Sequence, residues 1–232
     1  MFSFKQFDIR DERSAMKVGT DGVLLGAWAD VADDERILDI GTGSGIITLM
    51  AAQRNAEAHI VALDIDEGAV ADAHDNADRT EWGSRIEVVL SDVAEYKPTE
   101  KFDHIITNPP YFIQSLHSPD KQRTTARHTS SLEFSTIVRK SCELLRRGGK
   151  LSIVLPTDGA ARFRYAAFGH LRLTRLLDVV TKAGDEPLRT MMEFELRDDY
   201  PMPKCESLTI HNADGSYSGE YRLLTEDFYL KF

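Results

Sequence analysis

The sequence has little of several features whose abundance marks particular classes of protein. Its 232 residues include only two cysteines, Cys142 and Cys205, in unrelated contexts. Neither a disulfide nor a cysteine metal site is expected, and we expect a reducing compartment. No run of 18 or more apolar residues occurs, so no membrane span is expected. Residues 1–6 lack the apolar core of a signal peptide, which predicts a cytoplasmic protein without a membrane partner.

Basic residues are also in the minority, with 28 Lys and Arg against 38 Asp and Glu and a formal net charge of −10. Nucleic-acid binding relies on Lys and Arg contacts to phosphate, so the overall charge argues mildly against a nucleic-acid partner. The distribution matters more than the sum. Residues 139–175 contain nine basic side chains and two acidic ones. This sector is compatible with RNA binding, although solvated helix faces explain many such runs.

The hydrophobic content of 42% and the charged content of 28% are typical of a globular protein. At this length one domain can bury most of its apolar surface. We therefore expect a single domain over residues 1–232, because no linker or repeat divides the chain. Within it we expect an extension with a strand and a helix (1–35), a core (36–197) and a C-terminal extension (198–232).

From residue 36 onward, short apolar strands alternate with helices, which predicts an α/β fold with a mostly parallel sheet and helices on both faces. We expect seven strands, over residues 36–40, 59–64, 86–90, 102–107, 150–155, 171–180 and 190–196. We expect helices over residues 45–54, 67–79, 132–147 and 158–168. The short loop before the last strand predicts that this strand is antiparallel. The loop of about twenty residues after the fourth strand is unusually long, which indicates a functional segment.

A glycine-rich turn, Asp39-Ile-Gly-Thr-Gly-Ser-Gly45, follows the first of these strands. Gly41, Gly43 and Gly45 let the backbone turn sharply and approach a ligand closely. The spacing is one residue shorter than the Gly-x-Gly-x-x-Gly of dinucleotide binders. The carboxylate of Asp39 would repel a phosphate and attract a sulfonium or ammonium group. The pattern favours S-adenosylmethionine over NAD, although a purely structural turn would look the same.

The second strand ends in Asp64, nineteen positions after Gly45, where an acidic residue holds the hydroxyls of a nucleoside ribose. Asp66 competes for this role, but it is better placed to cap the helix that follows. Asp92 and Asn108 come after the third and fourth strands. Ligands of open α/β sheets bind beyond the carboxyl ends of the strands. We therefore expect these segments to converge on one cleft.

The fourth strand runs directly into Asn108-Pro109-Pro110-Tyr111. Two prolines fix the backbone and donate no N–H. The amide oxygen of Asn108 and the carbonyl of Pro109 could together accept both protons of a planar amino group, and Tyr111 offers a ring for stacking. This clamp would aim the nitrogen lone pair at a methyl donor without a strong general base. A plain turn is the alternative, since Asn and Pro favour turns.

The glycine turn and the Asn-Pro-Pro-Tyr motif together resemble those of S-adenosylmethionine-dependent amino-methyltransferases, which act on adenine N6, guanine N2 or the glutamine amide. Residues 16–29, Phe7 and the ending 228–230 are further similar to the bacterial tRNA(Val) adenine-37 N6-methyltransferases, and this resemblance runs nearly end to end. It implies a Rossmann-like class I methyltransferase fold and a monomer that needs no metal. It also implies methyl transfer from S-adenosyl-L-methionine to adenine 37 of tRNA, leaving S-adenosyl-L-homocysteine.

The resemblance implies a role for each matched residue. The methionine part of the cofactor would be held by Asp39 together with Gly41, Gly43 and Gly45. Asp64 would bind the ribose, and Asp92 would bind the adenine. Residues of the segment before the core would close over the cofactor, namely Lys17, Thr20 and Asp21. The clamp would hold a flipped-out adenine beside the cofactor, through Asn108, Pro109, Pro110 and Tyr111.

Basic residues near the same sheet edge are candidate RNA contacts. Arg123, Arg127 and His128 lie in the long loop, where phosphates would pass, and Arg162 and Arg164 follow the fifth strand. For His128 a phosphate contact or loop packing is favoured over a role as catalytic base. No appended RNA-binding domain is evident, so the catalytic domain would have to hold the tRNA alone.

Three other functions remain open at this point. Methylation of a protein glutamine amide uses the same chemistry, but those proteins usually carry an N-terminal helical domain, and only about 35 residues precede the first core strand here. Methylation of guanine N2 or of adenine N6 in DNA is possible, because the clamp recognises a planar amino group and not the molecule that carries it. A non-catalytic RNA- or nucleoside-binding module is less favoured, since both motifs are intact.

Overall fold

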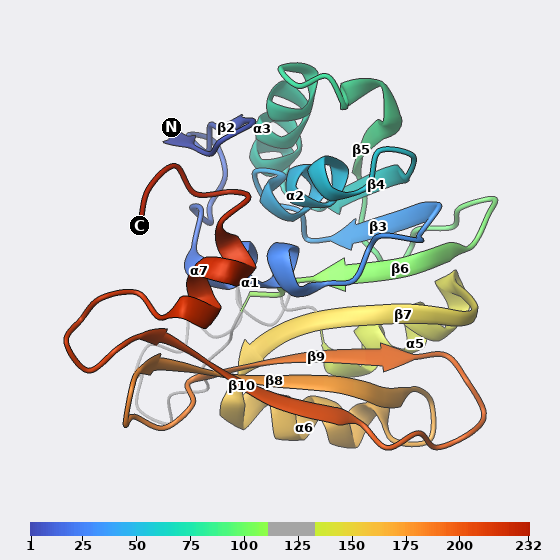
Figure 1. Cartoon of the computed structure of the whole chain (residues 1–232). Coiled ribbons are helices and arrows are strands. Elements are labelled where there is room, and N and C mark those ends of the chain that lie inside the picture. Colours follow the sequence, from blue (N-terminus) through green and yellow to red (C-terminus); the bar gives the residue numbers. More distant parts are fainter. Residues whose placement is uncertain (111–132) are drawn as a thin grey trace, which may run out of the picture.

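The protein is described by a computed structural model, which describes residues 1–110 and 133–232. Tyr111, Arg123, Arg127 and His128 lie outside the described residues. Most of the described chain folds around one sheet of eight strands, in the order β10-β8-β9-β7-β6-β3-β4-β5 (Figure 1). The strands are β3 (Arg36–Ile40), β4 (His59–Asp64), β5 (Ile86–Leu90), β6 (Phe102–Thr107), β7 (Leu145–Pro156), β8 (Arg172–Lys182), β9 (Arg189–Glu195) and β10 (Lys204–His211).

Helices cover both faces of the sheet, as the alternating pattern predicted. One face carries α1 (Thr20–Trp28), α2 (Ile46–Arg54), α3 (Glu67–Asp78) and α7 (Gly219–Thr225), and the other carries α5 (Phe134–Leu144) and α6 (Thr157–Ala167) (Figure 1). Successive strand residues feed opposite cores, since Ile37 packs with α1 and α2 while Leu38 packs with α5 and α6. None of the described helices is long and apolar enough to span a membrane.

The strand directions confirm the predicted topology, and the strand count differs from it. Strand β9 pairs antiparallel with β7 and with β8, and the other pairings in the sheet are parallel. The sequence predicted seven strands, whereas β10 adds an eighth beside β8. Leu208 and Ile210 of β10 are buried against the face that carries α7. Burial of this face holds the strand on the sheet, although Pro201 and Pro203 precede it.

The helix after the long loop ends earlier than predicted. We expected it to run to residue 147, but α5 ends at Leu144 and β7 begins at Leu145. The register of β7 against β6 shifts between Phe102 and His104, and Gly148 adopts a positive φ of 78°. A bulge near the start of β7 therefore uses the glycines that we had expected to stop the helix.

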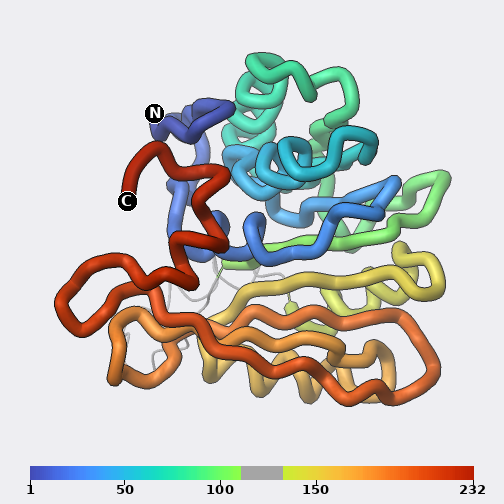
Figure 2. Tube along the Cα trace, in the orientation of Figure 1, coloured from blue at the N-terminus to red at the C-terminus, as the bar shows by residue number. Residues whose placement is uncertain are grey.

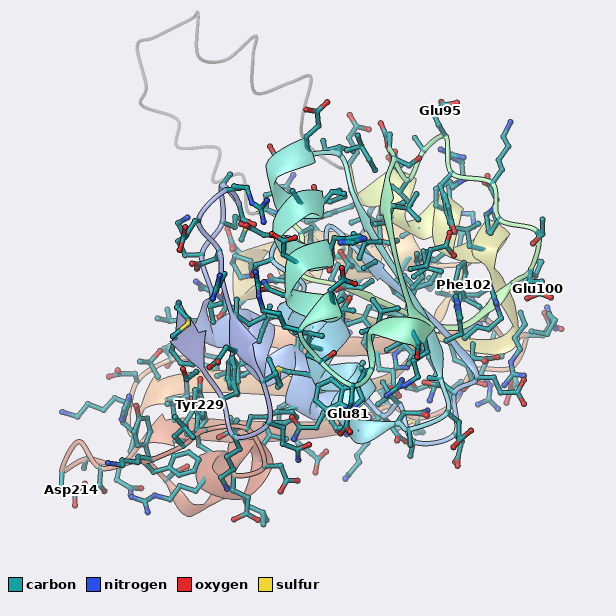
Figure 3. All side chains as sticks on the ribbon, turned by 90° about the horizontal axis from the view of Figure 1, so that it is seen from above. Glu81, Glu95, Glu100, Phe102, Asp214 and Tyr229 are labelled. Carbon is teal, nitrogen blue, oxygen red and sulfur yellow. The ribbon has the colours of Figure 1, made fainter. Side chains whose placement is uncertain are left out.

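The two ends of the chain pack together on one side of the molecule (Figure 2). The hairpin of β1 (Phe2–Ser3) and β2 (Asp8–Ile9) is antiparallel, and the amide of Lys5 donates to the carbonyl of Phe228 over 2.8 Å. Phe4 and Tyr229 form a β-bridge, with ring centroids 5.9 Å apart. Tyr229 lies at the side of the molecule opposite Phe102, which starts β6 (Figure 3).

A buried polar group ties the sheet together at the edge opposite the carboxyl ends. His104 is fully buried, and its Nδ1 lies 2.7 Å from Asp34 Oδ2 while its Nε2 lies 2.8 Å from Ser152 Oγ. Lys150 Nζ lies 3.2 Å from the other oxygen of Asp34. Burial works against the Asp34 charge, but His104 and Lys150 outweigh it and lower the pKa of that carboxyl. Because no solvent reaches His104, this Ser-His-Asp set is structural and not a nucleophile with its base.

Candidate active site

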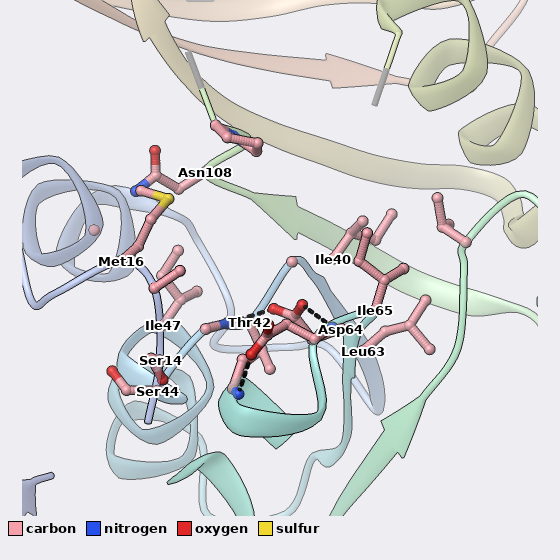
Figure 4. A pocket seen from close by; sticks show the side chains of 18 of the residues that line it. Ser14, Met16, Ile40, Thr42, Ser44, Ile47, Leu63, Asp64, Ile65 and Asn108 are labelled. Carbon is pink, nitrogen blue, oxygen red and sulfur yellow. Dashed lines mark hydrogen bonds between the residues drawn. The ribbon is translucent and has the colours of Figure 1, made fainter. Parts of the chain in front are cut away.

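A cavity of about 490 Å³ lies beyond the carboxyl ends of β3, β4, β5 and β6 (Figure 4). Its walls come from residues 14–17 with Gly19 and Gly22, the glycine turn, residues 63–66, residues 91–94, and the start of the Asn-Pro-Pro motif, with a contribution from α5. The segments that the sequence marked as strand ends therefore do converge on one cleft. The reason is topological, because β3, β4, β5 and β6 are parallel neighbours and end at the same edge.

The glycine turn has the backbone that its composition predicted. Gly41, Gly43 and Gly45 have φ values of 71°, 56° and 86°, a region that other residues adopt only with strain. Gly41 and Gly43 line the cavity, and no atom would lie within 4 Å of a Cβ at either position. Gly45 does not line it, and a Cβ there would meet Ala73 of α3 at 3.4 Å. Gly41 and Gly43 therefore leave space in the cavity, and Gly45 allows close packing of the turn on α3.

Asp39 lies beneath the turn and not in the wall of the cavity. Its Oδ2 accepts hydrogen bonds from Thr42 Oγ1 at 2.7 Å and from Thr48 Oγ1 at 2.8 Å. Its Oδ1 is buried without a hydrogen-bond partner among the described residues. Burial raises the pKa of this carboxyl to about 6, against the effect of the two threonines. Asp39 therefore places a carboxylate below the turn, and its direct contact with the cofactor stays a prediction.

Asp64 lines the cavity, and its carboxylate is oriented by two backbone amides. Oδ2 accepts from Gly43 N at 2.9 Å, and Oδ1 accepts from Asp66 N at 3.0 Å. Asp66 caps α3, as predicted, since its Oδ1 accepts from Ala69 N at 2.7 Å. Asp92 also lines the cavity, with its Oδ1 accepting from Ala94 N at 2.8 Å. Both predicted cofactor carboxylates therefore lie where a bound nucleoside could reach them.

Helix α3 anchors the N-terminal segment that forms another wall. The buried carboxylate of Asp72 accepts from Arg13 Nε at 2.7 Å, and from the amide and hydroxyl of Ser14 at 2.8 and 2.9 Å. Asn76, one turn further on, donates to the carbonyl of Ser44 at 2.9 Å. The N-terminal segment and the glycine turn are thus held by the same helix, α3. The next residues, Ser14 to Lys17, all line the cavity.

The residues expected to close over the cofactor do not act together. Lys17 lines the cavity, and its ammonium donates to the carbonyls of Asp11 and Ser14. Thr20 and Asp21 line a different cavity, and Asp21 Oδ2 accepts from Arg189 Nε at 2.8 Å. They do not cap α1 either, because its N-cap is Gly19. Thr20 and Asp21 therefore line the second cavity and not the first, and their contact with the cofactor stays a prediction.

The Asn-Pro-Pro motif enters the cavity directly from β6. Asn108 and Pro110 line it, whereas Pro109 is buried and does not. Met16 lies next to Asn108 in Figure 4. A Cβ at Gly22 of α1 would lie 3.8 Å from Asn108 Nδ2, so the amide sits against the first turn of that helix. The predicted stacking partner, Tyr111, falls in the part of the chain that the structure does not describe.

The predicted RNA contacts within the described residues lie outside this cavity. Arg162 and Arg164 are exposed on α6, which starts at the carboxyl end of β7. The guanidinium of Arg162 lies 5.9 Å from the centre of the Phe134 ring. They remain candidates for contacts to a larger substrate. The other predicted contacts, Arg123, Arg127 and His128, lie outside the described residues.

The charge of the lining favours a cationic ligand. Four carboxylates line the cavity, from Asp64, Asp66, Asp92 and Glu133. Among the described residues Lys17 is the one lysine of the lining, and its ammonium donates to backbone carbonyls. Apolar side chains form the rest of the wall between β4 and residue 94, among them Leu63 and Ile65 (Figure 4). This lining fits a cationic nucleoside such as S-adenosylmethionine. The hydroxyls of such a ligand can donate to the carboxylates, and its flat base can pack against the apolar walls.

Sequence reasoning missed the residues that anchor and complete the wall. Asp72 and Asn76 belong to no recognisable motif. The sequence nevertheless contains a sign of their role, because these two polar residues interrupt a row of small residues on the buried face of α3. That face has the spacing of one helix side and consists of Ala69, Asp72, Ala73, Asn76 and Ala77. A buried carboxylate among alanines requires hydrogen-bond donors from another segment. The pattern could therefore have predicted that some segment docks there, but not which one.

Comparison with known proteins gives a consistent result. The family model described as "Methyltransferase small domain" matches residues 14–174. The tRNA1(Val) (adenine(37)-N6)-methyltransferase of Bacteroides thetaiotaomicron is 48% identical over 231 residues, which cover 99% of this chain and 97% of that protein. The enzyme of the same name from Aeromonas hydrophila is 41% identical, with 99% and 97% covered.

Solved structures show the same fold at lower identity. A protein of Agrobacterium tumefaciens described as a predicted O-methyltransferase superposes with a TM-score of 0.68 at 21% identity, covering 90% of this chain and 96% of that one. The N-methyltransferase NodS of Bradyrhizobium japonicum, solved with S-adenosyl-L-homocysteine, has a TM-score of 0.53 at 17% identity, covering 75% and 83%. These likenesses support the class I methyltransferase fold alone. Because relatives of this name match the chain over nearly its full length, the chain belongs to the tRNA1(Val) (adenine(37)-N6)-methyltransferase family.

Proposed function

We propose that the protein transfers a methyl group from S-adenosyl-L-methionine to N6 of adenine 37 in tRNA(Val). The observation that carries this proposal is the presence of Asn108 and Asp64 in the walls of one cavity. One residue recognises a planar amino group and the other a nucleoside ribose, so acceptor and donor would meet there. The names of the full-length relatives support adenine and tRNA as the acceptor.

The residues present would hold the cofactor along the edge of β3, β4 and β5. The backbone of Gly41 and Gly43 would face the methionine part, Asp64 the ribose hydroxyls and Asp92 the adenine amino group. The bound cofactor supplies a methyl group activated by a sulfonium charge. The buried carboxylate of Asp39 lies below the turn, and its charge favours a cation above it. A phosphate-bearing dinucleotide would be disfavoured by the same charge.

The Asn-Pro-Pro motif would position the acceptor nitrogen. The side-chain oxygen of Asn108 and the carbonyl of Pro109 would accept the two N6 protons, which fixes the amino group and turns its lone pair toward the methyl donor. Charge that develops on the nitrogen is stabilised by these two oxygens. The methylated nitrogen then releases one proton to water, so no strong base is required. Tyr111 would stack on the adenine, which has to leave the anticodon loop to enter.

The exposed arginines Arg162 and Arg164 support a contact to the tRNA outside the cavity, and Arg123, Arg127 and His128 are proposed for the same purpose. One chain supplies every segment of the cavity described above, so we propose that the enzyme acts as a monomer. We place its action in the cytoplasm, where its tRNA substrate would be found.

The test is methyl transfer from labelled S-adenosylmethionine to bulk tRNA from cells that lack this protein. We expect label in valine tRNA alone, with N6-methyladenosine at position 37 identified by mass. Label in ribosomal RNA, DNA or a protein would keep the amino-group chemistry and discard the substrate. No transfer to any of these acceptors by folded protein that binds S-adenosylmethionine would overturn the proposal in favour of a binding module.

A further inference from the structure

A second cavity, of about 380 Å³, lies on the other side of the first turn of α1. We propose that it binds an unpaired nucleobase next to the target adenosine in the same RNA strand, and this inference rests on the proposed function. The base would stack on the aromatic side chains of the cavity, and its backbone phosphate would meet the basic side chains there. The site would thereby hold the substrate strand in register with the clamp at Asn108.

The first turn of α1 is a wall shared by the two cavities. Gly19 and Gly22 line the cavity that holds Asn108, and Thr20, Asp21 and Leu24 line the second one. Residues on opposite sides of a helix are separated by about 10 Å, the diameter of the helix with its side chains. A strand whose adenosine enters the first cavity can therefore present a neighbouring nucleotide to the second.

The second cavity opens at the same edge of the sheet as the first. Its floor is made by the carboxyl ends of β8 and β10, at Thr181 and His211, and by the start of β9 at Arg189. Helix α7 lies beside α1 at this edge (Figure 1) and contributes Tyr221. Strand β10, which the sequence did not assign to the sheet, thus completes a second site next to the first.

Aromatic rings dominate the lining. Tyr217 stacks between His211 and Tyr221, with centroids 4.7 and 5.2 Å away. Phe232 meets Tyr217 edge-on at 5.8 Å. The exposed fraction of Phe232 is 38%, so its ring offers area to a ligand, and it packs edge-on against the stacked rings of Tyr217 and Tyr221. Stacking of one base on such rings changes affinity by about 5- to 150-fold for any base, because every base has a π-face.

The charges of the lining suit a polyanion, in contrast to those of the first cavity. The lining has two basic side chains, Arg189 and Lys231, and one acidic side chain, Asp21. Asp21 accepts from Arg189 Nε at 2.8 Å, which fixes the guanidinium at the cavity wall. Positive charge beside stacked rings is the combination that single-stranded nucleic acids require.

The test uses the anticodon stem–loop of valine tRNA, intact or with an abasic site at either nucleotide that flanks adenosine 37. For the unchanged enzyme, one abasic site should lower kcat/KM for the RNA about tenfold. Tyr217→Leu and Phe232→Ala should each cause a similar loss on the intact RNA and little further loss on that abasic RNA. The affinity for S-adenosylmethionine should stay within twofold in both variants.

Tyr200→Leu is the matched control. Tyr200 is 72% exposed and precedes β10, at the opposite edge of the sheet, so it should behave as the unchanged enzyme. Thermal unfolding establishes that the variants fold, and Phe232→Ala, at an exposed ring, answers the question if Tyr217→Leu does not. Equal rates for both cavity variants and the unchanged enzyme, or losses that multiply with the abasic site, would overturn the inference. Absence of transfer to the intact RNA by the unchanged enzyme would instead overturn the proposed function.

Discussion

The backbone amide of Gly43 donates a 2.9 Å hydrogen bond to the carboxylate of Asp64. This contact joins two motifs that lie 21 positions apart in the sequence and at the ends of adjacent strands. The second carboxylate oxygen of Asp64 accepts a hydrogen bond from the amide of Asp66, so two backbone amides fix the orientation of Asp64. The glycine turn and Asp64, the acid that we propose for the ribose, therefore form one preorganised unit and not two independent contacts.

Gly43→Ala and Gly45→Ala form a matched pair that separates ligand contact from folding. Both positions have positive φ, so each alanine should lower the free energy of unfolding by about 1–2 kcal/mol. Only Gly43 lines the cavity. We expect Gly43→Ala to weaken S-adenosylmethionine binding at least tenfold and Gly45→Ala to change it less than threefold, as measured by calorimetry. Equal losses of affinity would show that the turn acts only as a structural unit.

Asp39→Asn should stabilise the fold and weaken the binding of S-adenosylmethionine. Burial raises the pKa of Asp39 from its ordinary 3.8 to about 6, so holding it ionised at pH 7 costs up to about 3 kcal/mol. The asparagine removes this cost and also the negative charge beneath the turn. We expect a higher Tm at pH 7.5 together with about fivefold weaker binding of S-adenosylmethionine, from ~1 kcal/mol of screened attraction. Binding of neutral S-adenosylhomocysteine should change less.

The same carboxyl sets a pH dependence with a defined sign. Because the folded pKa lies above the unfolded one, the folded state binds more protons between pH 4 and 6. The contribution of Asp39 to stability is therefore complete below about pH 4 and is lost as the pH rises to about 6, by ~1.4 kcal/mol per unit. The difference in unfolding free energy between wild type and Asp39→Asn should follow this course in denaturant titrations. A difference that is flat from pH 4 to 7 would contradict it.

Asp72→Asn should release the wall formed by residues 14–17. Four donors from Arg13 and Ser14 converge on Asp72, and an asparagine can satisfy only some of them. We expect a loss of about 2 kcal/mol in stability and severalfold weaker S-adenosylmethionine binding. Asp75→Asn is the control, because Asp75 also pairs with Arg13 but on the exposed surface, where such pairs contribute little. Unchanged binding in Asp72→Asn would mean that the wall stays in place without its anchor.

Asp72 also gives the opposite pH dependence to Asp39. Burial alone would raise its pKa, but the bonds from Arg13 and Ser14 outweigh burial and lower it. Its stabilising contribution is therefore present at neutral pH and is lost as the pH falls below the ordinary value of 3.8. Asp72→Asn should remove this part of the acid unfolding profile, as followed by circular dichroism.

Asn108→Ala tests the chemistry directly. The variant keeps the glycine turn and the carboxylates of Asp64 and Asp92, so S-adenosylmethionine should bind within about threefold of wild type. Turnover should fall by more than 100-fold, because the positioning of the amino group is lost. Single-turnover kinetics with tRNA measure the step itself. Product formation at the wild-type rate would exclude the amino-group clamp.

Much of the fold and part of the site could be predicted, because they depend on local patterns. Apolar runs bounded by turn residues identified the strands from β3 to β9, and the alternation of strand and helix predicted parallel order. That order alone brings Asp64, Asp92 and Asn108 to one edge, whatever the details of packing. Only residues 207–210 of the eighth strand are strand-like in the sequence, and they were not assigned to the sheet, because residues 204–207 are exposed and only half of the strand shows an apolar pattern.

Side-chain direction could not be predicted at α1. Residues 22–28 of this helix are all buried, so no polar face indicates which side meets the sheet and which side meets the cleft. The sequence therefore did not predict that Thr20 and Asp21 line the second cavity. Nor did it predict that Asp39 lies beneath the turn, since a residue at the tip of a strand can point into the cleft or beneath it. In both cases the direction depends on what packs on the other side.

The sequence by itself determined the chemistry of this protein, because glycines, a strand-end carboxylate and Asn-Pro-Pro each carry their function in local geometry. Only the tertiary structure decided which residues surround that chemistry. The docking of residues 10–14 on α3 through Asp72, and of β10 beside β8, joins segments far apart in the chain. Such contacts form because buried polar and apolar groups find partners in the compact state, and no spacing in the sequence identifies those partners.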